Sequence, residues 1–453
     1  MKTKVLLFSV CFLAATCFTQ KSKAQATDTG DSLALVDLYN STNGSNWYRQ
    51  NNWLTGPVST WYNVTVRNGR VTSLIGAGNN LVGTIPASIG NLTRLSYLDL
   101  RWDSLSGSIP ASIGRLVNLT HLDFSQDQLS GPLPDSIGNL GKLTELILSG
   151  NKLSGPIPAS IGNLSALTTL ELIFNQFSGS IPPTLGKLKN CYLLGLGGNQ
   201  LSGTIPSAIG NMSSLQLLDI FQNNLTGSFP PSFAKLKKLA AITAYSNHLY
   251  QAQNISFPDA LPDLNNVLLY YNNLNFNGLE SLVSNVYYVN CNAQAPLSLH
   301  PTDTVLSVSA GGTLKNNTYS WYLVGGASPT VITGDSTFHP LQSGSYYALI
   351  TNSVARLTLT TDTVAYTAPA AKVASLTVSL SPVPVQNRLS VSGLPQGANC
   401  RLVVSDAYGT VWLTKQSGGQ GTAFFDVSRL KTGTYTLTAV AANSRGAARF
   451  VKN

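Results

Sequence analysis

The chain has 453 residues, which suggests about three domains, and its 43% hydrophobic content excludes an intrinsically disordered protein. Only 10% of the residues are charged, and the formal charge of +9 is unevenly distributed, because residues 27–295 hold 13 basic and 14 acidic side chains. This nearly neutral part offers no continuous set of cations for phosphate groups, so we expect no nucleic-acid partner.

Residues 1–26 have the pattern of a secretory signal peptide. Two lysines precede an apolar run over residues 5–15, and the small residues Ala24 and Ala26 follow it. The run is too short for a transmembrane helix, and no later segment has about 18 consecutive uncharged apolar residues. We therefore expect an exported chain that starts after Ala26 and has no transmembrane span.

A repeat of 24 residues dominates the middle of the chain. Residues 95–110 and 143–158 both have leucine at the first, fourth and sixth positions, Asp or Asn at the ninth, and a closing Gly-x-Ile-Pro. The alternating apolar residues predict a short strand in each unit, and stacking buries apolar faces that one unit cannot bury alone. The units begin at Val71, Leu95, Leu119, Leu143, Leu167, Cys191, Leu215, Leu239 and Leu264.

A short polar residue occupies the ninth position of every unit. Such a side chain bonds backbone groups of the turn and of its neighbour, which predicts a ladder along the stack. The residues are Asn79, Asp103, Asp127, Asn151, Asn175, Asn199, Asn223, Asn247 and Asn272.

The pattern over residues 71–295 resembles the plant-type leucine-rich repeat, with its L-x-G-x-I-P motif. The resemblance implies a curved solenoid with a parallel sheet on its concave side, and both ends of such a stack need caps. The tryptophans of residues 27–70 (Trp47, Trp53 and Trp61) resemble the N-terminal cap of bacterial members. We expect residues 286–289 to form a last capping strand.

Residues 296–370 change character to strand-like runs separated by Gly, Ser and Asn turns. Trp321 and Tyr346 resemble the core tryptophan and corner tyrosine of the immunoglobulin-like fold. Ala348 stands where that fold often has a cysteine, so the resemblance implies a β-sandwich without the disulfide. The predicted strands cover residues 304–308, 319–324, 346–350 and 355–359.

Residues 375–453 resemble the type A C-terminal sorting domain of the Bacteroidetes type IX secretion system, although Pro-Val-Pro replaces the usual Pro-Asn-Pro. The resemblance implies export across the outer membrane by the type IX machinery, then release or surface attachment. A generic basic β module is the alternative. The residues that carry the resemblance are Pro382, Pro384, Asp406, Gly409, Gly433 and Tyr435.

The sequence shows no motif for chemistry. It has no P-loop, nucleophile elbow or zinc-type cysteine spacing, so we expect no catalytic residues, no metal and no cofactor. Asp99 and Asp123 lie on neighbouring strands and resemble a retaining glycosidase pair. We favour two solvated acids on an open sheet, and we expect His121 to face solvent.

Acidic and aromatic side chains project from the predicted concave face, where exposed aromatic and arginine residues serve recognition. Some of these rings could simply stack along the sheet. Tyr271 shares this face. The candidate binding residues are Tyr97, Asp99, Arg101, Trp102, His121, Asp123, Glu145, Glu171, Phe174, Asp219, Phe221, Tyr245 and Tyr270.

Taken together, the sequence predicts a mostly β chain with a leucine-rich-repeat solenoid, followed by two small β-sandwich domains. We expect a secreted or surface-displayed, non-catalytic protein that binds a protein or a glycan through the concave face. Three alternatives stay open. The chain could inhibit a secreted polysaccharide hydrolase, as the similar polygalacturonase-inhibiting proteins do, it could cleave a glycan with Asp99 and Asp123, or it could be purely structural.

Overall fold

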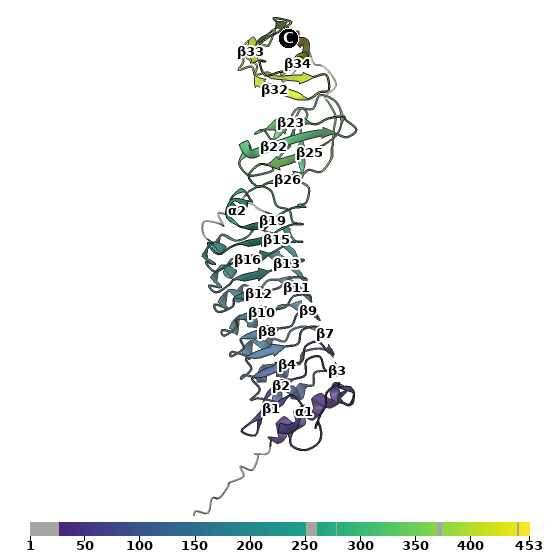
Figure 1. Ribbon diagram of the computed structural model, residues 1–453, viewed down its shortest axis with the longest axis vertical. Coiled ribbons are helices and arrows are strands. Elements are labelled where there is room, and N and C mark those ends of the chain that lie inside the picture. The colour runs from purple at the N-terminus through teal and green to yellow at the C-terminus, as the bar shows by residue number, and fades with distance from the viewer. Residues whose placement is uncertain (1–26, 251–260, 278, 369–373, 442–443) are drawn as a thin grey trace, which may run out of the picture.

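The computed structural model describes residues 27–250, 261–277, 279–368, 374–441 and 444–453. A stack of coils is followed by two smaller β units, and together they form an elongated molecule (Figure 1). The predicted signal peptide lies outside the described residues.

A helix and a tryptophan cluster cover the N-terminal end of the stack. Asp28 is the N-cap of helix α1 (Thr29–Ser41), and its carboxylate accepts hydrogen bonds from backbone N–H groups of the first turn. The rings of Trp47 and Trp53 lie 4.8 Å apart, as do those of Trp53 and Trp61. All three rings are buried, so they seal the apolar interior of the first coil.

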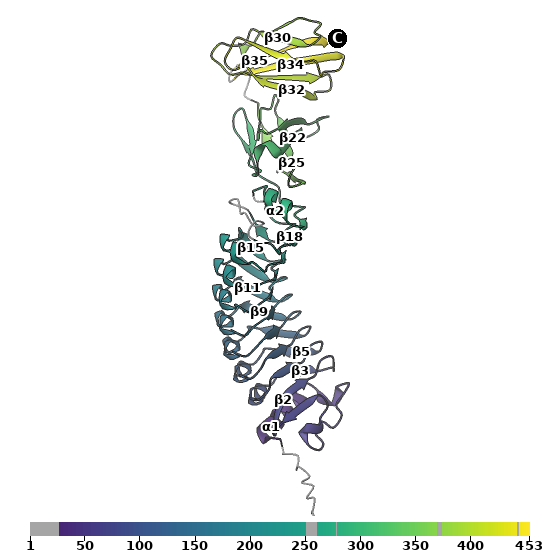
Figure 2. The same ribbon diagram turned by 60° about the vertical axis from the view of Figure 1, so that its left-hand side comes forward.

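Each coil contributes one short strand to a sheet that we call the concave sheet (Figure 2). Its strands are parallel, except for the antiparallel pair β1 and β2. In spatial order they are β1 (Val64–Arg67), β2 (Arg70–Ile75), β4 (Tyr97–Asp99), β6 (His121–Asp123), β8 (Glu145–Ile147), β10 (Thr169–Glu171), β12 (Leu193–Gly195), β14 (Leu217–Asp219), β16 (Ala241–Thr243), β18 (Asn266–Leu268) and β19 (Tyr288–Asn290).

A second parallel sheet follows the polar ninth position of the coils, and a short 3₁₀ helix then returns the chain. The strands are β3 (Val82–Thr84), β5 (Ser104–Gly107), β7 (Gln128–Gly131), β9 (Lys152–Pro156), β11 (Gln176–Ser180), β13 (Gln200–Thr204), β15 (Asn224–Gly227) and β17 (His248–Leu249). The 3₁₀ helices of these coils are η3 (Ala87–Asn91), η4 (Ala111–Arg115), η5 (Asp135–Asn139), η6 (Ala159–Asn163), η7 (Pro183–Lys187), η8 (Ser207–Asn211) and η9 (Pro231–Lys235).

The ninth-position residues form the predicted ladder inside the stack. Asn175 shows the pattern: its Oδ1 accepts a hydrogen bond from Leu153 N at 3.0 Å, and its Nδ2 donates to Leu148 O at 2.9 Å and to Leu172 O at 3.2 Å. Asn175 is buried, and the fourth-position leucines, such as Leu98, are completely buried. Apolar packing and a buried polar ladder therefore hold the coils in register.

The middle unit packs directly on the last coils. Helix α2 (Leu279–Asn285) precedes β19, and Glu280 on this helix accepts hydrogen bonds from Thr313 and Asn352 of the middle unit. One apolar cluster runs without a break from α1 to Tyr366. The strands of the middle unit are β20 (Leu299–Pro301), β21 (Leu306–Val308), β22 (Asn317–Leu323), β23 (Thr330–Thr333), β24 (Thr337–Phe338), β25 (Gly344–Asn352), β26 (Leu357–Thr360) and β27 (Val364–Tyr366).

The C-terminal unit has two sheets and an apolar cluster of its own. Its link to the middle unit includes a hydrogen bond from Arg445 Nη1 to Leu341 O at 3.3 Å. The strands are β28 (Ala374–Ser375), β29 (Ser379–Ser381), β30 (Arg388–Ser392), β31 (Arg401–Asp406), β32 (Val411–Gln416), β33 (Thr422–Asp426), β34 (Gly433–Ala441) and β35 (Ser444–Lys452).

The predicted fold class, a mostly β solenoid followed by two small β units, is confirmed. Some strand limits differ from those expected. The capping strand is β19, which starts two residues after Val286, because helix α2 extends to Asn285 and buries Val286 against the stack. In the middle unit, Trp321 is buried against Phe338, with ring centroids 5.3 Å apart.

Candidate binding surface

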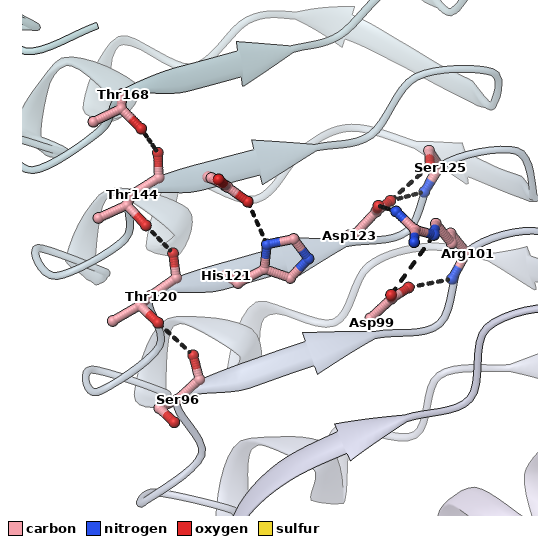
Figure 3. Close-up of polar contacts among 10 residues, drawn as sticks. Ser96, Asp99, Arg101, Thr120, His121, Asp123, Ser125, Thr144 and Thr168 are labelled. Atoms are coloured by element: carbon pink, nitrogen blue, oxygen red, sulfur yellow. Dashed lines mark hydrogen bonds and ion pairs between the residues drawn. The ribbon is translucent and has the colours of Figure 1, made fainter. Parts of the chain in front are cut away.

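The concave sheet presents a polar cluster near its N-terminal end, in the second to fourth coils (Figure 3). Arg101 Nη1 lies 2.9 Å from Asp123 Oδ2, and Arg101 Nε lies 3.6 Å from Asp99 Oδ2. Asp99 and Asp123 are paired directly across β4 and β6. One guanidinium group therefore bridges two carboxylates that the parallel strands bring side by side.

A histidine lies beside this ion pair. The ring of His121 stacks on Tyr97 with centroids 4.1 Å apart and an angle of 4° between the planes. Its Nδ1 donates a hydrogen bond to Glu145 Oε2 at 2.6 Å. The stack covers the ring, so His121 is only 9% exposed although it lies on a sheet face that is open to solvent.

The expectations of solvated acids and a solvent-facing histidine are wrong. Asp99 is 3% exposed and Asp123 is 1% exposed. The physical reason is that neighbouring side chains cover these residues. Arg101 pairs with Asp99 of its own coil and with Asp123 of the next coil, and Tyr97 stacks on His121 of the next coil. Because the Arg101 guanidinium occupies the space between the two carboxylates, this geometry favours an ion pair over the acid and nucleophile of a glycosidase.

Other acids on this face are also partly withdrawn from water. Burial raises the pKa of Asp99, of Glu171 and of Asp219. For Glu171, repulsion by neighbouring carboxylates adds to the effect of burial. The concave face thus has a concentrated negative charge that a cationic or hydrogen-bond-donating partner would stabilise.

An aromatic row occupies the C-terminal half of the concave face. Phe221 stacks on Tyr245 with centroids 5.0 Å apart, and Tyr245 stacks on Tyr270 at 4.5 Å. Phe174 meets Phe221 edge-on at one end, and Tyr271 meets Tyr270 edge-on at the other. These five rings form one continuous surface across several coils.

Phe221 contributes to packing more than to the exposed surface. It is only 9% exposed, and its ring lies over Gly197 of the preceding coil, where a Cβ atom would come within 2.4 Å of Phe221 Cε1. The absence of a side chain at Gly197 makes room for this ring. Phe221 is therefore a support for the aromatic row, and Phe174 and Tyr271 are its exposed members.

Three exposed rings share one unusual backbone position, the eighth of the coil. Trp102, Phe174 and Tyr271 have φ of 60°, 55° and 55°. Each side chain is between 54% and 66% exposed. In three other coils the same position is glycine, such as Gly150 and Gly198, which adopts positive φ without steric strain. In the remaining coils it is Gln126, Gln222 or Ser246, which also have positive φ. A bulky side chain there costs roughly 1–2 kcal/mol.

The residues predicted to mark the sorting domain occupy turns and strand ends. Asp406 Oδ1 accepts hydrogen bonds from Tyr408 N and Thr410 N, and Gly409 in the same turn has φ of 84°. Gly433 begins β34, and Tyr435 on that strand donates its hydroxyl to Lys431 O at 3.0 Å. Pro382 and Pro384 lie between β29 and β30. Asp406 and Tyr435 thus hold local turns through hydrogen bonds. The part of all six residues in export stays a prediction.

Comparison with known proteins agrees with the architecture. Residues 67–196 match the model of the leucine-rich repeat region, and residues 190–212 and 214–236 match the Leucine Rich Repeat model. This part of the chain is a leucine-rich repeat domain. No helix in the described ranges is long and apolar enough to cross a membrane.

Two solved structures are similar to a part of this chain that includes the leucine-rich repeat domain. One is the ectodomain of the plant membrane receptor kinase GASSHO1/SCHENGEN3 from Arabidopsis thaliana, in complex with CASPARIAN STRIP INTEGRITY FACTOR 2. Its sequence is 29% identical to that of this chain, and the TM-score is 0.56. The match covers 60% of this chain and 33% of the receptor ectodomain. The matched part thus spans a third of the length of that ectodomain.

The other is a plant ice-binding protein, which is 28% identical to this chain and has a TM-score of 0.51. The match covers 60% of this chain and 90% of the ice-binding protein. Both structures are similar to this chain in fold, and the leucine-rich repeat ectodomain is typical of ligand-binding, receptor-like proteins.

The structure places the candidate residues in the strands of the concave sheet or in the segments that directly follow them, and two features of this surface were not predicted from the sequence. The positive φ at the eighth position was not anticipated, although the recurrence of Gly there in three coils was a visible signal. The close approach of Asp99, His121 and Asp123 was also missed, because these residues come from two coils and form no contiguous motif.

Proposed function

We propose that this chain is a secreted or surface-displayed recognition protein without catalytic activity, which binds a protein ligand through the concave face of its leucine-rich repeat domain. The observation that carries this function is the set of Trp102, Phe174 and Tyr271. All three rings project into solvent from a backbone conformation that glycine would adopt at lower cost. Strained backbone positions of this kind cluster at binding sites, where the surrounding structure holds them in place.

A protein ligand is favoured over a glycan for two reasons. The similar plant receptor ectodomain was crystallised with a protein factor, CASPARIAN STRIP INTEGRITY FACTOR 2. In addition, exposed aromatic rings and Arg101 beside acidic groups are the side chains on which protein interfaces rely most. If the bound protein is a polysaccharide hydrolase, the chain acts as its inhibitor, which pectin-hydrolysis assays with and without the purified chain would reveal.

The remaining parts of the chain fit export to the cell surface. We assign residues 1–26 as a signal peptide and residues 375–453 as the type IX sorting domain, with residues 296–370 as an immunoglobulin-like spacer. The hydrogen bond from the Tyr346 hydroxyl to Gln342 O, at 2.9 Å, is the bond that a corner tyrosine makes in such sandwiches.

The test starts with cross-linking of the full chain on whole cells and identification of the cross-linked protein by mass spectrometry. The affinity for that protein is then measured for the wild type and for the triple variant Trp102→Gly, Phe174→Gly and Tyr271→Gly. We expect binding to weaken by more than about tenfold, while the melting temperature is unchanged or rises, since glycine accepts positive φ without strain.

The matched control is Tyr408→Ala, which removes a ring that is 84% exposed but lies in the C-terminal unit. This variant should bind like the wild type. Unchanged affinity of the triple variant would show that the concave face is not the binding surface.

Ice binding is a second candidate, and a regular row of hydroxyl side chains favours it. Ser96, Thr120, Thr144 and Thr168 each donate a hydrogen bond to the carbonyl of the equivalent residue one coil earlier, at 2.8–2.9 Å (Figure 3). The row gives an evenly spaced surface, and one similar structure is a plant ice-binding protein. Ice recrystallisation in the presence of the wild type and of Thr144→Lys tests this candidate; equal crystal growth with both proteins and with buffer discards it.

A further inference from the structure

We propose that Asp99, His121 and Asp123 form a binding site for a divalent transition-metal ion, of which Zn²⁺ is the best match. One ligand atom from each of the three residues lies within 4.8 Å of the other two. The residues come from β4 and β6, so the site is built across two coils on the concave face. Asp99 lies 22 and 24 residues before His121 and Asp123, which is why the sequence showed no metal motif.

The histidine provides the observation that points to a ligand. His121 Nε2 is buried and has no hydrogen-bond partner, whereas Nδ1 donates to Glu145. Figure 3 shows Asp99 and Asp123 on one side of the His121 ring, and the dashed line on its other side marks the hydrogen bond from Nδ1 to Glu145. A buried polar atom without a partner is costly. With the proton on Nδ1, Nε2 has a free lone pair, which is the form of histidine that binds metals.

Each of the three proposed ligands also makes a hydrogen bond that fixes its orientation. Glu145 orients the His121 ring, which matches the carboxylate–histidine–metal arrangement of known metal sites. Ser125 donates two hydrogen bonds to Asp123 Oδ1, from its backbone N at 2.9 Å and from Oγ at 2.6 Å. The backbone N of Arg101 donates to Asp99 Oδ1 at 3.2 Å. These contacts leave the Oδ2 atoms of both aspartates available to a cation.

Arg101 is the competitor for this position. Its guanidinium pairs with the Oδ2 atoms of Asp99 and Asp123, so it supplies the positive charge that two buried carboxylates require. The Arg101 side chain is 43% exposed and can move into solvent, whereas both aspartates are fixed in the sheet. Metal and guanidinium thus exclude each other, and the site switches between an ion pair and a metal complex.

The donor set determines the class of metal. Two carboxylate oxygens and one imidazole nitrogen suit a borderline ion such as Zn²⁺ better than Ca²⁺ or Mg²⁺, which prefer oxygen alone. Three protein ligands leave a coordination position for water or for a side chain of a bound protein.

The test uses the full exported chain without an affinity tag, treated with a chelator and titrated with ZnCl₂ by calorimetry at pH 7.5. We expect one strong site. His121→Gln should weaken binding by more than about tenfold, and Glu145→Gln, which removes only the orienting group, by about 10- to 100-fold. The matched control is Asp219→Asn, which removes a half-buried acid at the same coil position but without a neighbouring histidine. It should leave the affinity unchanged.

Two further measurements separate a metal site from a purely structural ion pair. Arg101→Met removes the competing cation, so Zn²⁺ should bind more tightly than to the wild type; an ion-pair role alone predicts no gain. The Co²⁺ complex should show visible absorption that His121→Gln abolishes. The site is refuted if no stoichiometric binding is found, if His121→Gln binds like the wild type, or if Asp219→Asn weakens binding as much as His121→Gln does.

Discussion

The backbone N–H of Leu105 donates a hydrogen bond to Asp127 Oδ1 at 3.0 Å, while Oδ2 of the same carboxyl group is buried without a partner. Asp127 occupies a rung of the ladder that is asparagine in most coils. In those coils the amide nitrogen donates to two backbone carbonyls, as Asn151 does to Phe124 O and Leu148 O. A carboxyl group can donate such a hydrogen bond only when it is protonated.

Asp127→Asn should therefore stabilise the chain at pH 8. Burial raises the pKa of Asp127 to about 7 from its ordinary value of 3.8, so between about pH 4 and pH 7 the folded state holds a proton that the unfolded state loses. The stability contributed by this group is present below pH 4 and is lost as the pH rises through 7. We expect a gain of about 1–3 kcal/mol at pH 8 and little gain at pH 4, measured by denaturant unfolding.

The reverse substitution is the control for this effect. Asn151→Asp places a carboxyl group on the next rung and should destabilise the chain more at pH 8 than at pH 5. Equal effects of Asp127→Asn at both pH values would mean that the carboxyl group does not hold its proton in the folded state.

The contact between Gly197 and Phe221 predicts a second result. Gly197→Ala should cost about 1–3 kcal/mol because the added methyl group displaces the Phe221 ring. In the Phe221→Ala background the same substitution should cost much less, and a double-mutant cycle measures the difference. Gly141→Ala is the matched control, since a Cβ there meets nothing within 4 Å. Additive effects would contradict the predicted contact.

Glu280 predicts how the junction of the solenoid and the middle unit responds to acid. Burial alone would raise its pKa, but hydrogen bonds from Thr313, Asn352 and Asn316 outweigh burial and lower it. The stability that Glu280 contributes is therefore present above the ordinary carboxyl pKa and is lost as the pH falls below it. Glu280→Ala should lower stability by about 1–2 kcal/mol at pH 7 and flatten the loss of stability in acid. Calorimetric melting of both proteins between pH 3 and pH 7 checks this, and parallel curves would refute it.

The buried thiols should be inert while the chain is folded. Burial raises the pKa of Cys191 to about 12 and that of Cys291 to about 11, so neither forms the reactive thiolate at pH 8. Reaction with a disulfide reagent at pH 8 should be negligible in the folded protein and fast in guanidinium chloride. Rapid labelling of either cysteine in the folded protein, located by mass spectrometry, would contradict its burial.

The fold could be predicted because each coil contains the residues that determine its structure. The leucines that face inward and the polar ninth residue recur at a fixed spacing, so their roles follow from position alone. The burial of Asp99 and His121 could not be predicted in this way. It depends on how the side chains of Tyr97 and Arg101 lie over them, from the same coil as Asp99 and from the coil before His121. The repeat pattern does not contain that information.

Contacts between units were also hidden in the sequence. Glu280 and Asn352 are 72 residues apart and belong to different parts of the chain, yet they share a hydrogen bond of 2.6 Å. Strand runs in the middle unit were found where apolar alternation was clear, as in β22 and β25. The short strand β24 has only two residues, too few to show a period.

The continuous apolar cluster from α1 to Tyr366, and the separate cluster of the last unit, divide the molecule unequally. Proteolytic removal of residues 375–453 would leave the interior of the other two parts closed to water. Loss of residues 296–453 would instead expose apolar side chains of the last coils to water. Cleavage can therefore remove the last unit without unfolding the rest of the chain, whereas removal of the middle unit would favour association of solenoids through the uncovered coils.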